Sequence, residues 1–133
     1  MKRLIVTLVI VFIFTVSAMV MMGTTIDVEA KGEMQEQSEV GVTVKISLDG
    51  KDGTLGFKII LDTHSVDLGR YKFAEIAVLR ADGKEYKTSV KSEEGSGHHR
   101  SAIVEFDNPE TKEVEVVIKD VAGIKERVFK FSL

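Results

Sequence analysis

The sequence predicts an all-β domain: a seven-stranded antiparallel sandwich of the immunoglobulin-like or fibronectin type, preceded by an N-terminal hydrophobic signal or anchor helix. Apolar and polar residues alternate with period two in several runs of residues 40–133, as in half-buried strands. Turn-forming residues separate these runs about every 8–12 residues, and no long helical period follows residue 30. A barrel is the main alternative. The lack of Cys and Trp excludes an antibody-type core but not the wider sandwich architecture.

Residues 1–30 have the form of an export segment. Met1-Lys2-Arg3 supplies positive charge, and an uncharged, mostly apolar run extends from Leu4 to Met22. As a helix this run would measure about 28 Å, close to the hydrocarbon thickness of a bilayer. Val28-Glu29-Ala30 carries the small residues of a cleavage site. The segment is therefore either a signal peptide cleaved after Ala30 or an uncleaved anchor, and a secreted or extracytoplasmic domain is expected in both cases.

The remaining chain is expected to form one domain over residues 40–133, after a flexible polar spacer at 31–39. Acidic and basic residues are interspersed, with a net charge of −3 for the chain, and no basic block indicates nucleic-acid binding. The absence of Cys excludes a disulfide, so the domain must be stabilised by its core alone. This is more typical of exported prokaryotic proteins than of small eukaryotic secreted ones.

The first three strands are predicted from the apolar pattern. Five apolar residues alternate from Val40 to Leu48, and four from Leu55 to Leu61. A Gly- and Asp-rich turn at 49–53 joins them. The third strand, Phe73 to Arg80, is apolar on both faces and is expected to be covered on both. An Asp-Gly turn at 81–84 then predicts a hairpin.

Four shorter alternating runs predict the remaining strands. They cover Tyr86–Val90, Ala102–Phe106, Val114–Ile118 and Phe129–Leu133. Because antiparallel neighbours reverse direction, alternate connections share one end of a sandwich. The connections at 62–72 and 92–99 are thus expected at the same end, together with the turn at Gly123.

This end gathers every histidine of the chain and several carboxylates. Imidazole and carboxylate groups are typical ligands of Zn²⁺ and Cu²⁺. We therefore predict a candidate metal site for zinc or copper, whose ligands come from His64, His98, His99, Asp62 and Asp67. The alternative is that these histidines are structural or simply lie at the surface.

Three segments in this order resemble small exported prokaryotic immunoglobulin-like sandwich domains of unassigned function. They are Asp62-Thr63-His64-Ser65-Val66-Asp67-Leu68, Gly95-Ser96-Gly97-His98-His99-Arg100, and the run from Ile118 to Phe129. The resemblance covers residues 55–131. It implies a sandwich fold and joint action of the two histidine segments, but no activity.

The sequence therefore predicts an exported binding module with a metal or other ligand at the histidine-bearing end. The alternative is a structural or adhesion module of the cell envelope, with cell-surface protein partners and no metal site. No acid–base pair has the spacing of a catalytic motif, so we predict neither enzyme activity nor catalytic residues. Membrane contact is expected only through residues 4–22, if they are not removed.

Overall fold

The computed structural model describes residues 33–133. The predicted signal peptide or anchor at residues 1–30 lies outside these residues. Within residues 33–133, none of the helices has the length and apolar character needed to cross a membrane.

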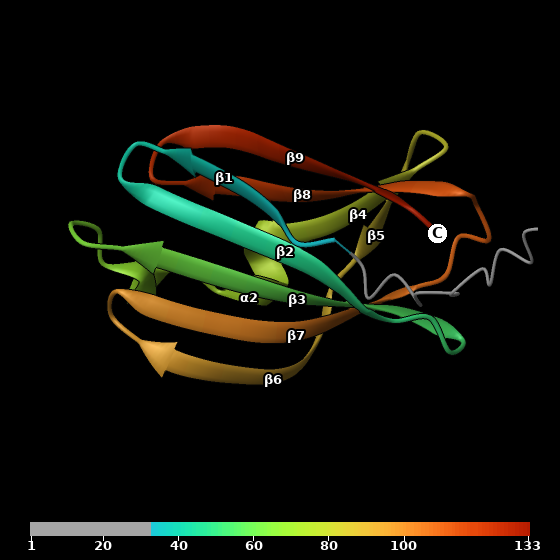
Figure 1. The fold of residues 1–133 in the computed structure, drawn as a ribbon, viewed down its shortest axis with the longest axis horizontal. Helices are drawn as coiled ribbons and strands as arrows, with labels where there is room; N and C mark the ends of the chain where they lie inside the picture. The colour runs from blue at the N-terminus through green and yellow to red at the C-terminus, as the bar shows by residue number, and fades with distance from the viewer. Residues whose placement is uncertain (1–32) are drawn as a thin grey trace, which may run out of the picture.

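Two antiparallel sheets make up the described part of the chain, which confirms the all-β prediction (Figure 1). The first sheet has the order β1-β2-β3-β7-β6 and the second has the order β5-β4-β8-β9. Residues 33–133 thus form nine strands, where the sequence predicted seven. The first sheet contains β1 (Gln35–Glu39), β2 (Val42–Gly50), β3 (Thr54–Thr63), β6 (Ser89–Ser96) and β7 (His99–Asp107). The second sheet contains β4 (Ala77–Ala81), β5 (Lys84–Lys87), β8 (Glu113–Val121) and β9 (Ile124–Ser132).

The core lies between the two sheets and follows the period-two pattern. On β2, Val42, Val44 and Ile46 are at most 1% exposed, while the residues between them are partly exposed. The ring of Phe57 on the first sheet lies 5.0 Å from the ring of Phe131 on the second, measured between centroids. Aromatic pairs at this spacing stabilise the packing beyond the area they bury. The predicted core faces are therefore the faces that pack the sheets together.

The prediction of a flexible polar spacer at residues 31–39 is wrong for Gln35–Glu39, because these residues form β1. This strand pairs antiparallel with β2 along its whole length. Its side chains also reach the second sheet: the Gln37 amide donates to the backbone oxygen of Val128 over 2.7 Å, and the Gln35 amide donates to that of Lys130. None of the β1 side chains is fully buried. The sequence of this strand therefore lacks the alternation of apolar and polar residues that predicts a strand.

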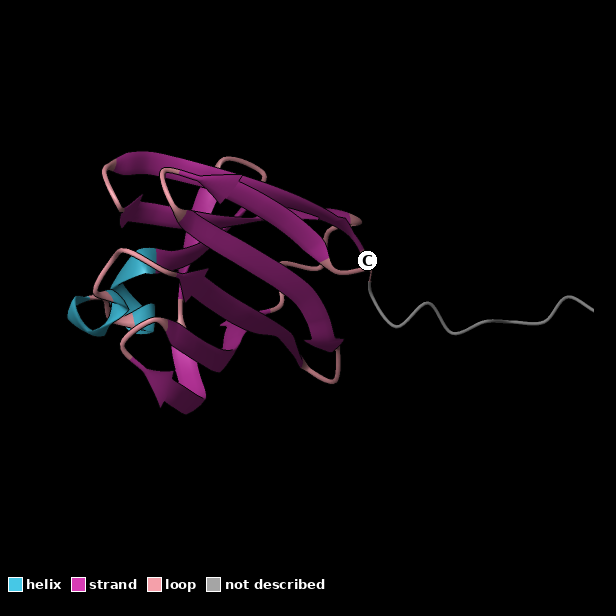
Figure 2. Cartoon of the chain, turned by 60° about the vertical axis from the view of Figure 1, so that its left-hand side comes forward, coloured by secondary structure: helices cyan, strands magenta, loops and turns pink. Residues whose placement is uncertain are grey.

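The predicted third strand begins later than expected. Phe73–Ile76 form the short helix α2, and only Ala77–Ala81 are extended, as β4. Phe73 and Ile76 are both buried, which the helical spacing of three residues allows. A helix joined directly to a strand thus explains an apolar run that resembles a strand buried on both faces. Figure 2 shows α2 and the 3₁₀ turn η1 (Leu68–Arg70) together at one end of the molecule.

The predicted fourth strand is two strands in different sheets. β5 ends at Lys87 in the second sheet, and β6 starts at Ser89 in the first. Thr88 lies at the crossing, where its hydroxyl donates to the backbone oxygen of Ala77. β6 then continues to Ser96, so most of the predicted connection at 92–99 is strand and only Gly97-His98 forms the turn.

Four connections meet at one end of the sandwich, the left-hand end in Figure 1. We call it the histidine end, and it consists of residues 40–41, 64–76, 97–98 and 122–123. Backbone hydrogen bonds join two of these connections: Thr63 N–H donates to His98 O over 2.9 Å, and Leu68 N–H donates to Gly97 O over 3.0 Å. The two histidine-bearing segments therefore lie side by side, as the alternation of chain direction predicts.

Candidate functional site

His64 and His99 form the centre of the candidate site. His99 is the first residue of β7, and His64 follows the last residue of β3. Their ring centroids lie 6.4 Å apart, and the ring planes are inclined at 85°. Both residues are exposed. Two imidazoles from distant parts of the sequence thus face solvent next to each other.

Asp62 holds the His99 ring. The two residues are opposite each other in the pairing of β3 with β7, and Asp62 Oδ1 lies 2.7 Å from His99 Nδ1. The other carboxylate oxygen of Asp62 lies 4.0 Å from Lys45 Nζ. Because Nδ1 is occupied by the carboxylate, Nε2 is the nitrogen of His99 that can bind a ligand. A carboxylate on the second nitrogen is the usual arrangement around metal-binding histidines.

Asp67 and His98 are placed differently from the other three predicted ligands. Asp67 Oδ1 accepts a hydrogen bond from Gly69 N over 2.9 Å, so the carboxylate caps η1. His98 lies in the turn between β6 and β7, where its backbone oxygen accepts a hydrogen bond from Thr63 N–H. Within residues 33–133, no three His, Cys, Asp or Glu side chains are grouped closely enough to hold a metal ion. The structure therefore brings together His64, His99 and Asp62, and not the whole predicted set.

Arg100 fixes the connection that carries His64. Its side chain points inward from β7 and donates to Leu68 O over 2.7 Å and also to Tyr71 O. It further donates to Glu93 over 3.2 Å, and its guanidinium lies 5.0 Å from the centre of the Phe73 ring. These contacts attach residues 64–76 to the first sheet. The connection is consequently held in place next to His99.

Thr63 and Tyr71 attach the same connection to its other neighbours. The Thr63 hydroxyl donates to Gly41 O over 2.7 Å and accepts from the backbone N–H groups of Ser65 and Val66, each over 3.2 Å. The Tyr71 hydroxyl accepts from Ala122 N over 2.9 Å. The position of His64 is thus determined by contacts with both neighbouring turns.

A buried arginine completes the support of the histidine end. Arg127 is 1% exposed and donates to Val121 O over 2.9 Å and to Glu39 O over 3.1 Å. Burial lowers the pKa of its guanidinium below the usual value for arginine. The predicted site residues do not include Arg127. The signal that identifies it is its spacing, because Arg127 has the same parity as the inward-facing Phe129 and Phe131.

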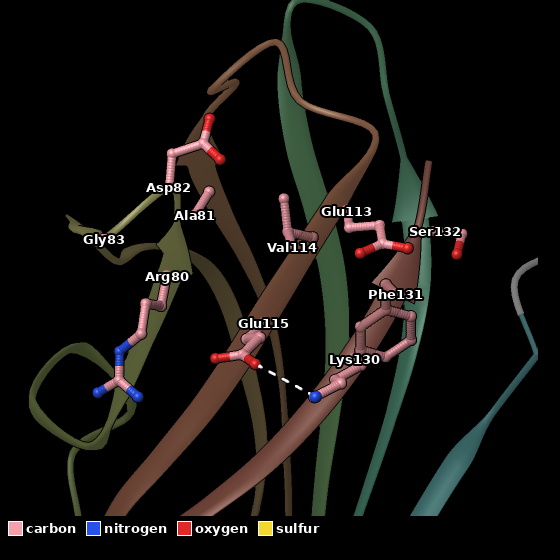
Figure 3. Close-up of a pocket in the computed structure, with 10 residues that line it drawn as sticks. All are labelled: Arg80, Ala81, Asp82, Gly83, Glu113, Val114, Glu115, Lys130, Phe131 and Ser132. Atoms are coloured by element: carbon pink, nitrogen blue, oxygen red, sulfur yellow. Dashed lines mark ion pairs between the residues drawn. The ribbon is translucent and has the colours of Figure 1, made fainter.

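Two hollows lie on the surface of the described residues. One of about 280 Å³ lies on the outer face of the first sheet, beside His99, and is lined in part by Lys58, Ile60 and Glu94. A larger one of about 390 Å³ lies at the end of β4, as Figure 3 shows. There Glu115 lies 3.8 Å from Lys130, and Arg80 is bonded to Glu85 and Glu126 over 3.0 and 3.1 Å. Since these charges are paired with each other, the described residues that line the larger hollow present no free cation toward a ligand.

Comparison of the chain with protein-family models, curated proteins and solved structures finds no match. The resemblance to exported sandwich domains therefore stays a prediction.

Proposed function

We propose that this chain is an exported immunoglobulin-like binding module whose histidine end binds a divalent metal ion, zinc or copper, through His64 and His99. The observation that carries the proposal is the pair of neighbouring, exposed imidazoles, one of them held by a carboxylate on Nδ1. We propose neither catalytic residues nor enzyme activity.

The strand order supports the immunoglobulin-like part of the proposal. The neighbours β2-β3-β7-β6 and β5-β4-β8-β9 correspond to an A-B-E-D sheet and a sheet with C-F-G neighbours plus one extra edge strand. In this correspondence β1 is an additional strand at the edge of the first sheet. In variable domains of this architecture, the loops at one end of the sandwich form the binding site. The connection after β3, which corresponds to the B–C loop, carries His64 here, and the β6–β7 turn before His99 lies beside it.

The distance between the imidazoles supports the metal part. Two imidazoles on one tetrahedral Zn²⁺ have ring centroids about 5 Å apart, because Zn–N bonds measure about 2.0–2.1 Å. The rings of His64 and His99 are 6.4 Å apart. They must therefore approach by roughly 1 Å, which exposed side chains achieve by small rotations about χ1 and χ2.

Calorimetric titration tests the proposal. The full chain, purified in mild detergent without a histidine tag, is titrated with Zn²⁺ and with Cu²⁺. We expect saturable binding that is lost in His64→Ala and His99→Ala. His98→Ala is the matched control, because His98 is also exposed but lies in the turn beside the pair. Binding weaker than about 1 mM, or binding that survives both substitutions, would contradict the metal site.

The alternative proposal is a structural or adhesion module of the cell envelope. It is favoured by the supporting hydrogen bonds of Thr63, Tyr71 and Arg100, which would order this end without a ligand. In that case the histidines are incidental and the partners are cell-surface proteins. Failure to bind metal, together with an intact Met1 at the N-terminus of the exported protein, favours this alternative. A protein starting at Lys31 indicates release from the membrane.

A further inference from the structure

We propose that the metal ion at the histidine end is shared by two copies of this chain, each supplying His64 and His99. This inference rests on the proposed function and adds the partner that completes the site. The partner is a second copy of the same chain, and the shared ion is Zn²⁺.

The number of ligands is the first argument. Structural zinc sites in proteins have four ligands in tetrahedral arrangement. The described residues of one copy offer two neighbouring imidazoles and no group of three metal-binding side chains. Asp62 is turned toward Nδ1 of His99, where it orients the ring. One copy therefore supplies half of a closed zinc site.

Accessibility is the second argument. The His99 side chain is 70% exposed, and His64 is exposed as well. Figure 1 shows the connection after β3, which begins with His64, projecting beyond the neighbouring turns at this end. Both rings can consequently meet an identical surface without rearrangement of the strands.

Symmetry and charge are the third argument. A tetrahedron has two-fold axes, so an ion on the axis of a symmetric dimer receives the same pair of ligands from each copy. Four neutral imidazoles leave the charge of Zn²⁺ unbalanced. The two Asp62 carboxylates, one behind each His99, supply two negative charges next to the ion. The assembled site then has four nitrogen ligands and a carboxylate behind each His99 ring.

Sedimentation velocity tests the inference. The full chain in mild detergent is measured with EDTA and with one Zn²⁺ per two chains. We expect Zn²⁺ to double the protein mass of the sedimenting species and EDTA to reverse the change. Calorimetry is expected to give one ion per two chains. His64→Ala and His99→Ala should abolish the change, while His98→Ala should retain it.

Three outcomes overturn the inference. Binding of one ion per chain without a change in mass overturns the sharing and leaves the proposed metal function intact. No binding at all overturns both. A zinc-dependent dimer that survives His64→Ala and His99→Ala, or is lost in His98→Ala, shows that other residues hold the ion. Circular dichroism of each variant checks that the variant is folded, so that a loss of the zinc-dependent dimer can be assigned to the substituted histidine.

Discussion

Asp62 and His99 lie opposite each other on β3 and β7, with the carboxylate oxygen 2.7 Å from Nδ1 of the ring. Strand pairing therefore sets the geometry of Asp62 and His99, whereas His64 is positioned by the connection after β3. A position inside a ladder of backbone hydrogen bonds holds a side chain more firmly than a turn does. His64 and His98 lie outside the strands and lack this support.

Removing the carboxylate should weaken metal binding without removing a ligand. In Asp62→Asn we expect the affinity for Zn²⁺ to fall by about 10–100-fold, because the His99 ring loses its charged partner. Calorimetry measures the effect. Lys45→Gln is the control, since Lys45 lies 4.0 Å from the same carboxylate but touches neither imidazole in the described contacts. Equal affinity in wild type and Asp62→Asn would show that the carboxylate plays no part.

Gly95 should be required for the approach of β6 to the start of β7. It has a φ of +84°, and a Cβ at this position would overlap the backbone oxygen of His99. Gly95→Ala is expected to destabilise the domain by about 1–3 kcal/mol or more, since strain adds to the overlap. Gly97→Ala is the matched control: its φ is +63°, but nothing lies within 4 Å of the added Cβ. Urea denaturation of the two variants should therefore show the greater loss for Gly95→Ala, and the opposite order would contradict the geometry.

The amide of Gln37 should stabilise the attachment of β1 to the second sheet. Gln37→Ala removes a hydrogen bond to Val128 O and is expected to lower the free energy of unfolding by about 1 kcal/mol. Glu36→Ala is the neighbouring control, because Glu36 makes only a 3.8 Å ion pair with Lys45 at the surface. Denaturant unfolding followed by circular dichroism distinguishes them. Equal stability of the two variants would mean that β1 is held by its backbone alone.

Acid should destabilise the domain partly through the outer face of the second sheet. Hydrogen bonds from Lys119 and Arg80 lower the pKa of Glu85 below 4.5, and a hydrogen bond from Arg80 lowers the pKa of Glu126 in the same direction. Since these pKa values are lower in the folded state, their stabilisation is present above pH 4.5 and is lost as the pH falls through the folded values.

The variant Glu85→Gln with Glu126→Gln should therefore lose less stability than wild type when the pH falls from 5 to about 3. Urea unfolding at each pH measures the difference. Glu75→Gln controls for the loss of a negative charge elsewhere on the surface, where Glu75 pairs with Lys72 over 3.3 Å. The same acid slope in wild type and the double variant would refute this account.

Local pattern predicted the buried faces and part of the site. Period-two alternation identified Val42, Val44 and Ile46 as core, because burial of one face of a strand makes every second residue apolar. The reversal of chain direction at each turn was enough to place His64 and His99 at the same end, and the structure shows their rings to be neighbours. The export of the domain and its metal binding stay predictions, since the described residues do not test them.

The sequence by itself determined that this chain forms an all-β domain with its histidines at one end. Only the tertiary structure decided that Gln35–Glu39 join the first sheet, that Phe73–Ile76 form a helix, and that the chain changes sheets at Thr88. It also decided which carboxylate meets His99. The physical reason is that alternation along a strand records which face is buried, whereas the neighbouring strand and the register depend on contacts between distant parts of the chain.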